Sequence, residues 1–140
     1  MGLKYKLSTD YDGTLSRKSV QSYIKSLVEL GHEVWITTSR YDSIDKYPTE
    51  EVKEWKINNL EKEWNHLFEV ADKVGISREH IIFTNKESKV PYIQEQKFLW
   101  HLDDDWIELN RINDSTKTIG ISVVGQENWI EKCNKLLNET

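Results

Sequence analysis

The sequence predicts a single three-layer α/β/α domain on a parallel β-sheet, and three observations support this fold class. The chain has 140 residues, the length of one ordinary domain. Short apolar blocks alternate with stretches of helical spacing, which is typical of strands joined by crossover helices. The blocks are largely continuous, without a clean polar alternation, as expected for a parallel sheet covered on both faces.

In the first half of the chain, residues 3–9 alternate in polarity and predict a strand of about six residues that ends at a carboxylate cluster. Residues 20–30 have helical spacing, and Gly31 is placed to cap that helix. Residues 33–38 (EVWITT) predict a buried strand, and an apolar stripe over residues 60–74 predicts a long helix.

In the second half, residues 78–84 predict a strand and residues 91–98 a short helix. Residues 99–103 (LWHLD) and 117–124 (KTIGISVV) predict the last two strands, and residues 129–137 have the apolar face of a terminal helix. Five strands therefore alternate with helices.

Composition excludes several classes of protein. The formal charge is −5, which argues against a large nucleic-acid surface. No window is long and apolar enough for a membrane span, and residues 1–9 lack the apolar core of a signal peptide, so we expect a cytoplasmic protein. The single cysteine, Cys133, excludes an internal disulfide and a multi-cysteine zinc site.

Two acidic motifs follow predicted strands. Asp10 and Asp12 stand directly after the first strand, and Gly13 lets the backbone bend there. Asp103, Asp104 and Asp105 end the fourth strand. Oxygen ligands of this kind suit Mg²⁺, which commonly retains a substrate phosphate in its shell. The alternatives are a solvated Asp-Gly turn for the first motif and an acidic helix N-terminus for the second.

Two further elements carry groups that bind phosphate. Thr38, Ser39 and Arg40 end the second strand with hydroxyls and a guanidinium, although such hydroxyls often only cap a turn. Lys86 and Lys89 lie in a polar turn, where one ammonium could approach the carboxylates and the other be solvated.

Taken in this order, the four elements resemble the motifs of the haloacid dehalogenase (HAD) superfamily of phosphotransferases, over essentially the whole chain. The corresponding residues are Asp10, Asp12, Thr38, Lys89, Asp103 and Asp104. The resemblance implies a Rossmann-like sheet with strand order 3-2-1-4-5, which would bring both acidic motifs to one edge. It favours Lys89 over Lys86, because Lys89 directly precedes the helix that leads to the fourth strand.

The resemblance also implies roles. Asp10 would attack phosphorus to form an aspartyl-phosphate, and Asp12 would exchange protons with the leaving oxygen and the hydrolytic water. Mg²⁺ would be held by the Asp10 carboxylate, the Asp12 carbonyl and Asp104, with Asp103 supporting that site. Thr38 would bind a phosphoryl oxygen, and Lys89 would balance charge. The expected substrate-binding residues are Gly13, Thr14, Ser39 and Arg40.

Residues 41–57 exceed an ordinary loop, and Pro48 marks a helix start inside them. Within a single domain spanning residues 1–140, we expect this segment to be a short lid that uses Tyr41, Tyr47 and Trp55 to select substrate. Alternatively, Trp55 extends the apolar stripe of the following helix.

The predicted function is Mg²⁺-dependent hydrolysis of a small phosphate ester, with a nucleotide preferred and a sugar phosphate or a phosphorylated nucleic-acid end left open. The alternatives are a catalytically silent HAD-like binding protein and a receiver-like regulatory module. In receivers the phosphorylated Asp closes the third strand, whereas here Thr84 and Asn85 stand there. The sequence sets neither the oligomeric state nor a role for Asp105.

Overall fold

Five parallel strands form one sheet in the order β3-β2-β1-β4-β5, which confirms the predicted fold class and strand order. The computed structural model describes residues 3–47 and 54–138, without the side chains of 54–58. The strands are β1 (Lys6–Thr9), β2 (Glu33–Thr38), β3 (Ile81–Phe83), β4 (Trp100–Asp103) and β5 (Ile119–Ser122). The helices are α1 (Lys18–Glu29), α2 (Glu54–Val74), α3 (Val90–Gln96), α4 (Trp106–Ser115) and α5 (Trp129–Asn138).

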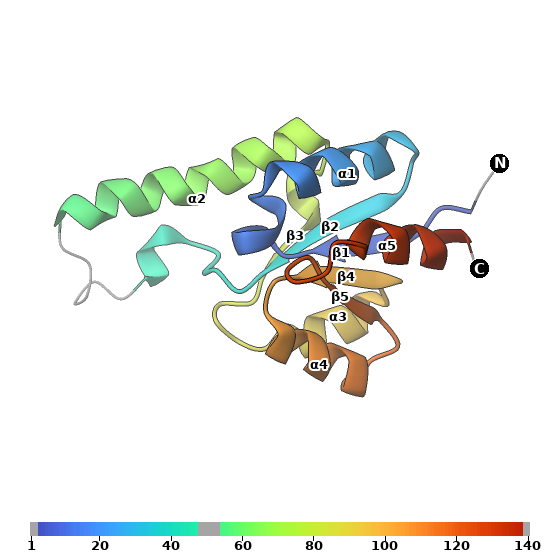
Figure 1. Ribbon diagram of the computed structural model, residues 1–140. Coiled ribbons are helices and arrows are strands. Elements are labelled where there is room, and N and C mark those ends of the chain that lie inside the picture. Colours follow the sequence, from blue (N-terminus) through green and yellow to red (C-terminus); the bar gives the residue numbers. More distant parts are fainter. Residues whose placement is uncertain (1–2, 48–53, 139–140) are drawn as a thin grey trace.

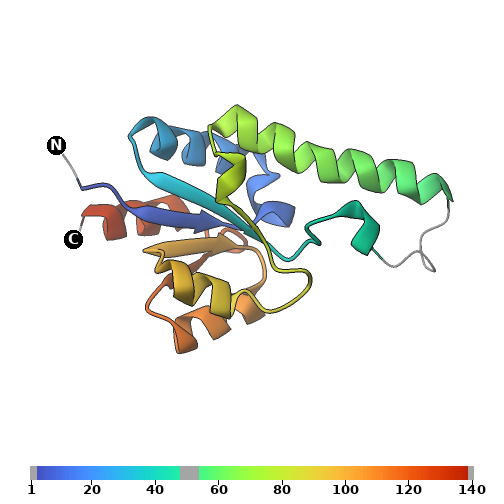
Figure 2. The same cartoon turned by 180° about the vertical axis from the view of Figure 1, so that it is seen from behind.

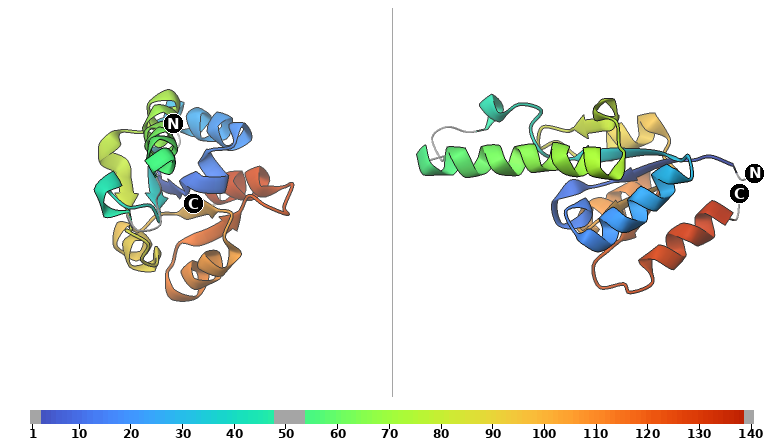
Figure 3. Two further views of the ribbon diagram at one scale, coloured as in Figure 1. Left: turned by 90° about the vertical axis from the view of Figure 1, so that its left-hand side faces the viewer. Right: turned by 90° about the horizontal axis from the view of Figure 1, so that it is seen from above.

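The helices cover both faces of the sheet. Helices α1, α2 and α5 pack on one face, and α3 and α4 pack on the other (Figures 1 and 2). Figure 3 shows the same layers from two further directions, with the long helix α2 extending past the sheet. In the part of the chain that the structure describes, no helix has the length and apolar character to cross a membrane.

The two faces of the sheet differ in the size of their apolar cores. The large core includes Leu7, Ile36 and Leu102 from the central strands, together with apolar residues of α1, α2 and α5. The core beneath α3 and α4 is much smaller and has Ile93, Phe98 and Ile112 as its buried apolar residues. Because strand side chains alternate between faces, neighbours of the large-core residues point toward this second side.

Several elements are shorter than predicted. Strand β1 has four residues, and β3 has three because Arg78–His80 form a 3₁₀ turn before it. The acidic cluster is followed by helix α4, for which Asp105 is the N-cap: its Oδ1 accepts hydrogen bonds from the backbone N–H groups of Ile107 (3.0 Å) and Glu108 (3.3 Å). The capping role considered for this cluster therefore applies to Asp105.

Candidate active site

The carboxyl end of the sheet brings the two acidic motifs together. Asp10 follows β1 and Asp103 ends β4, and the two strands are neighbours in the sheet. The backbone N–H of Asp10 donates to the carbonyl of Leu102 (2.8 Å), which fixes this junction. Carboxylate oxygens of Asp10, Asp103 and Asp104 lie within 4.8 Å of one another. They border a cavity of about 470 Å³ whose lining also includes Asp12, Gly13, Ser39, Lys86, Lys89 and Arg111.

Lys89 lies between the two motifs. Its Nζ donates to Asp10 Oδ1 (2.9 Å) and to Asp103 Oδ2 (2.7 Å), and all three side chains are almost fully buried. Burial lowers the pKa of Lys89, but the charges of Asp10 and Asp103 outweigh that effect and leave it above its ordinary value. Lys86 is exposed and lies elsewhere on the cavity rim. The geometry thus places Lys89, and not Lys86, against the carboxylates.

Glu108 positions Lys89 and was not identified from the sequence. Its Oε1 accepts hydrogen bonds from the backbone N–H of Lys89 and from the hydroxyl of Ser88 (3.1 Å) at the start of α3. Glu108 stands in the first turn of α4 and is buried. Only the packing of α3 against α4 brings it to Lys89, so no local sequence signal marks it.

Asp10 has an environment that sets it apart from an ordinary surface carboxylate. Burial raises its pKa well above the usual value; Lys89 lowers the pKa in turn, and Asp103 raises it. Thr14 makes a long contact of 3.4 Å from its hydroxyl to Asp10 Oδ2 and is fully buried. Thr14 therefore supports Asp10 and does not line the cavity.

A tight turn, Tyr11–Leu15, carries the rest of the first motif. The backbone leaves helical geometry at Asp12 (ψ 125°) and Gly13 (φ 70°). Only glycine adopts the second conformation readily, and a Cβ at Gly13 would collide with the Asp104 carboxylate. Gly13 thus allows the two acidic motifs to approach each other.

Arg40 is paired within the protein. Its Nε and Nη2 donate to the two carboxylate oxygens of Asp12 (2.9 and 2.7 Å), and its Nη1 donates to the carbonyl of Glu63 in α2 (2.8 Å). The guanidinium also lies 4.9 Å from the centre of the Tyr11 ring. Arg40 thus contacts Asp12, whereas the sequence predicted a contact with substrate.

Thr38 also has an internal contact. Its Oγ1 accepts a hydrogen bond from the backbone N–H of Arg40 (3.3 Å), and the residue is fully buried outside the cavity lining. This is the turn-capping arrangement that strand-end hydroxyls commonly make. Ser39, the next residue, does line the cavity.

The acidic cluster is suited to a hard cation. Asp103 already accepts four hydrogen bonds, two at Oδ2 from Lys89 and His101 and two at Oδ1 from the backbone N–H groups of Asp104 and Asp105. These use the full acceptor capacity of a carboxylate. Asp10 and the exposed Asp104 are therefore the side chains that fit as direct ligands, with Asp103 holding the site from behind.

The expected lid lies partly outside the described residues. Residues 48–53, with the expected helix start at Pro48, and the side chain of Trp55 are not described. The described part contains Tyr41 and Tyr47, whose rings meet edge to face at 4.9 Å between centroids. Neither ring lines the acidic cavity.

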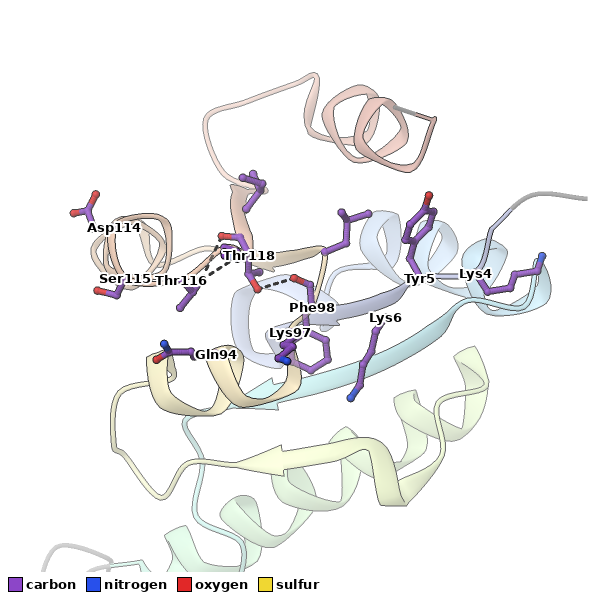
Figure 4. A pocket seen from close by; sticks show the side chains of 13 residues that line it. Lys4, Tyr5, Lys6, Gln94, Lys97, Phe98, Asp114, Ser115, Thr116 and Thr118 are labelled. Carbon is purple, nitrogen blue, oxygen red and sulfur yellow. Dashed lines mark hydrogen bonds between the residues drawn. The ribbon is translucent and has the colours of Figure 1, made fainter. Parts of the chain in front are cut away.

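A larger cavity of about 880 Å³ lies at the opposite, amino end of the sheet (Figure 4). Figure 4 shows Lys4 and Lys6 pointing away from each other, and each is engaged, Lys4 with the carbonyl of Leu30 and Lys6 with Gln96 (2.5 Å). Size alone therefore does not mark the functional site. The smaller cavity carries the buried charged cluster, and charge arrangement is the better criterion.

Comparison with known proteins gives a similarity in structure. No family model matches the sequence, and no curated protein matches it. A solved structure from Vibrio cholerae, provisionally described as a 3-deoxy-D-manno-octulosonate 8-phosphate phosphatase, is similar in fold with 14% sequence identity and a TM-score of 0.44. The match covers 96% of this chain and 83% of that one.

Proposed function

We propose that this chain is a HAD-type phosphatase that hydrolyses phosphate monoesters. The observation that carries the proposal is the buried ammonium of Lys89 between Asp10 and Asp103, at the border of an open cavity. A carboxylate that attacks a phosphate ester must approach a like charge. At an effective dielectric of 20, two unit charges about 4 Å apart repel by about 4 kcal/mol. A fixed cation beside the carboxylate offsets that repulsion.

In the proposed reaction, an oxygen of Asp10 attacks phosphorus, and the bond to the ester oxygen breaks as the aspartyl-phosphate forms. Asp12 gives its proton to the departing oxygen and then takes one from the water that attacks the aspartyl-phosphate. Hydrolysis restores both carboxyl groups and releases phosphate. Lys89 stays beside Asp10 and neutralises charge that collects on the phosphoryl oxygens.

Asp10 and Asp104 would hold Mg²⁺, with the Asp12 backbone carbonyl as the expected third protein ligand. When bound, the ion supplies charge neutralisation at the transferred phosphoryl group. Ser39 and Gly13 border the same cavity and would contact the phosphate. Thr38 acts through the turn that orients Arg40 and Ser39.

We propose a nucleotide as the preferred substrate class. Tyr41 and Tyr47 flank the loop that leaves the site at Arg40, and aromatic rings suit a nucleobase. A sugar phosphate is the competing substrate class, and turnover of a panel of both kinds of ester distinguishes them.

The test is turnover of p-nitrophenyl phosphate and of a panel of nucleoside monophosphates and sugar phosphates, with Mg²⁺ and with EDTA. We expect Mg²⁺-dependent phosphate release, loss of release in EDTA, and none from Asp10→Asn. Asp12→Asn should slow turnover by about 10² or more, the scale of general acid–base catalysis. Release by Asp10→Asn at more than a small fraction of the wild-type rate would exclude this mechanism.

A further inference from the structure

A row of buried polar side chains crosses the sheet beneath the candidate site. Ser8 and His101 are register partners in β1 and β4, and both are fully buried. Because side chains alternate along strands, Ser8 shares a face with Asp10, two residues on, and His101 shares it with Asp103. This is the face covered by α3 and α4, where the apolar core is small. The row therefore leads directly into the acidic cluster.

The row is hydrogen-bonded from end to end. Thr37 Oγ1 lies 2.8 Å from Ser8 Oγ, and Ser8 Oγ lies 2.8 Å from His101 Nδ1. His101 Nε2 lies 2.9 Å from Asp103 Oδ2, the same oxygen that accepts from Lys89. A continuous path of side chains thus joins β2, β1 and β4 to the lysine that contacts Asp10.

The chemistry of the groups fixes the direction of each bond. An ionised Asp103 only accepts, so Nε2 of His101 carries the proton and donates. Burial favours the neutral ring and holds the pKa of His101 below its ordinary value, although Asp103 opposes this. Nδ1 is then an acceptor, so Ser8 donates to it and in turn accepts from Thr37. Every donor along the row is then matched by an acceptor.

Burying a row of polar side chains costs free energy that apolar side chains would not. Buried polar groups stabilise a fold only when fully paired, and apolar residues would fill the same positions at lower risk. Ser8 and His101 stand two residues before Asp10 and Asp103 on the same face, and Thr37 extends the row onto β2. On the opposite face, Leu7 and Leu102 belong to the large core, and the buried hydroxyls of Thr9 and Thr38 bond to neighbouring backbone groups. A chain of side-chain hydrogen bonds that ends on Asp103 indicates a role tied to the carboxylates.

We propose that His101, held in one tautomer by Ser8, is a positioning residue that fixes the Asp103 carboxylate and so holds Lys89 against Asp10. This inference rests on the proposed function, in which Lys89 neutralises the phosphoryl group. Asp103 Oδ1 is anchored by backbone N–H groups, and the other oxygen, Oδ2, is held by His101 on one side and contacts Lys89 on the other.

Replacing His101 by Gln or by Asn distinguishes the roles of its two ring nitrogens. The Gln side chain reaches the position of Nε2 and can donate to Asp103, whereas the Asn side chain reaches only the position of Nδ1, near Ser8. His101→Gln should keep kcat within about threefold of wild type. His101→Asn should lower kcat by about tenfold or more, with KM changed less than about threefold, since the substrate still meets the same cavity.

Thr37→Val is the matched control because it removes a hydroxyl from the same buried row at the end remote from Asp103. It should lower the melting temperature without the selective loss of kcat. A crystal structure of each variant without metal gives a readout independent of activity: Lys89 Nζ should still bridge Asp10 and Asp103 in His101→Gln and lose that position in His101→Asn.

The outcomes decide two questions separately. If the wild type releases no phosphate, the proposed function fails, while the crystal structures still decide whether His101 positions Lys89. The inference would be overturned if Lys89 keeps its position in His101→Asn and the variant has the wild-type kcat. If His101→Asn does not fold, His101→Gln decides the question alone. Displacement of Lys89 in folded His101→Gln would overturn the inference. Lys89 in place, together with near-normal kcat, would support it.

Discussion

Arg40 holds both carboxylate oxygens of Asp12 through a two-pronged contact, Nε to Oδ2 at 2.9 Å and Nη2 to Oδ1 at 2.7 Å. The same guanidinium bonds the carbonyl of Glu63, so it ties the turn after β1 to helix α2. A fork of this geometry fixes the plane of the carboxylate as well as its position. In the proposed mechanism, Asp12 must exchange one of these contacts for the leaving oxygen.

The first prediction concerns this fork. Arg40→Lys keeps the charge but cannot form both bonds in one plane, so we expect kcat to fall by about tenfold as Asp12 loses its fixed orientation. Arg40→Gln should cause a similar fall and also lower the melting temperature, because the buried contact to Glu63 is lost. Steady-state kinetics and thermal melting measure both effects. A wild-type kcat in Arg40→Lys would show that charge alone suffices.

The second prediction concerns the metal. Mg²⁺ bound to the folded state should raise the melting temperature, since a ligand at about 100 times its Kd stabilises by about 2.7 kcal/mol. Asp104→Asn should abolish most of this shift because it removes the exposed ligand of the cluster. Asp105→Asn, which keeps a helix-capping side chain, is the neighbouring control. Equal shifts in both variants would rule out Asp104 as a ligand.

The third prediction concerns stability and pH without metal. Burial raises the pKa of Asp10, so its protonated form stabilises the fold, and that contribution is lost as pH rises through the raised pKa. Asp10→Asn should therefore melt at a higher temperature than wild type at pH 8 in EDTA. The difference should shrink as pH falls toward about 4, near the ordinary pKa of Asp, and as Mg²⁺ is added. A variant less stable than wild type at pH 8 would contradict this.

Ionisation of Asp103 should affect the stability of the fold in the opposite direction to ionisation of Asp10. Burial raises its pKa, but the hydrogen bond from His101 and the charge of Lys89 outweigh this and lower it. Its ionised form therefore stabilises the fold at neutral pH, and that contribution declines as pH falls below about 4. Asp103→Asn should accordingly destabilise the protein at pH 8, in contrast to Asp10→Asn.

The sequence predicted the sheet well because its evidence is local. Buried strands such as Glu33–Thr38 are apolar blocks, and the carboxylates follow strand ends directly. It missed what depends on packing between distant segments. Glu108 reaches Lys89 because α3 packs on α4, and Arg40 contacts Asp12 and the Glu63 carbonyl of α2 together. No spacing along the chain encodes either contact.

The last prediction concerns residues 41–47, which are anchored at the edge of the candidate site. The carbonyl of Tyr41 accepts a hydrogen bond from the Trp64 indole (3.3 Å). The backbone N–H of Asp42 donates to Asn85 Oδ1 (3.0 Å). Asn85 and Lys86 both adopt positive φ angles, 55° and 68°, a conformation that non-glycine residues adopt at a cost. The segment is thus held against the strained loop whose Lys86 lines the cavity.

Tyr41→Ala and Tyr47→Ala should each change KM and the ranking of phosphate esters while leaving kcat for p-nitrophenyl phosphate within about threefold, because remote contacts affect binding more than the chemical step. Nucleotides should lose more than sugar phosphates if the rings meet a base. Tyr5→Ala is the matched control, since Tyr5 is a half-buried ring stacked on His32 (5.9 Å) at the amino end of the sheet. An unchanged ranking in Tyr41→Ala, Tyr47→Ala and Trp55→Ala would refute a role for residues 41–57 in substrate choice.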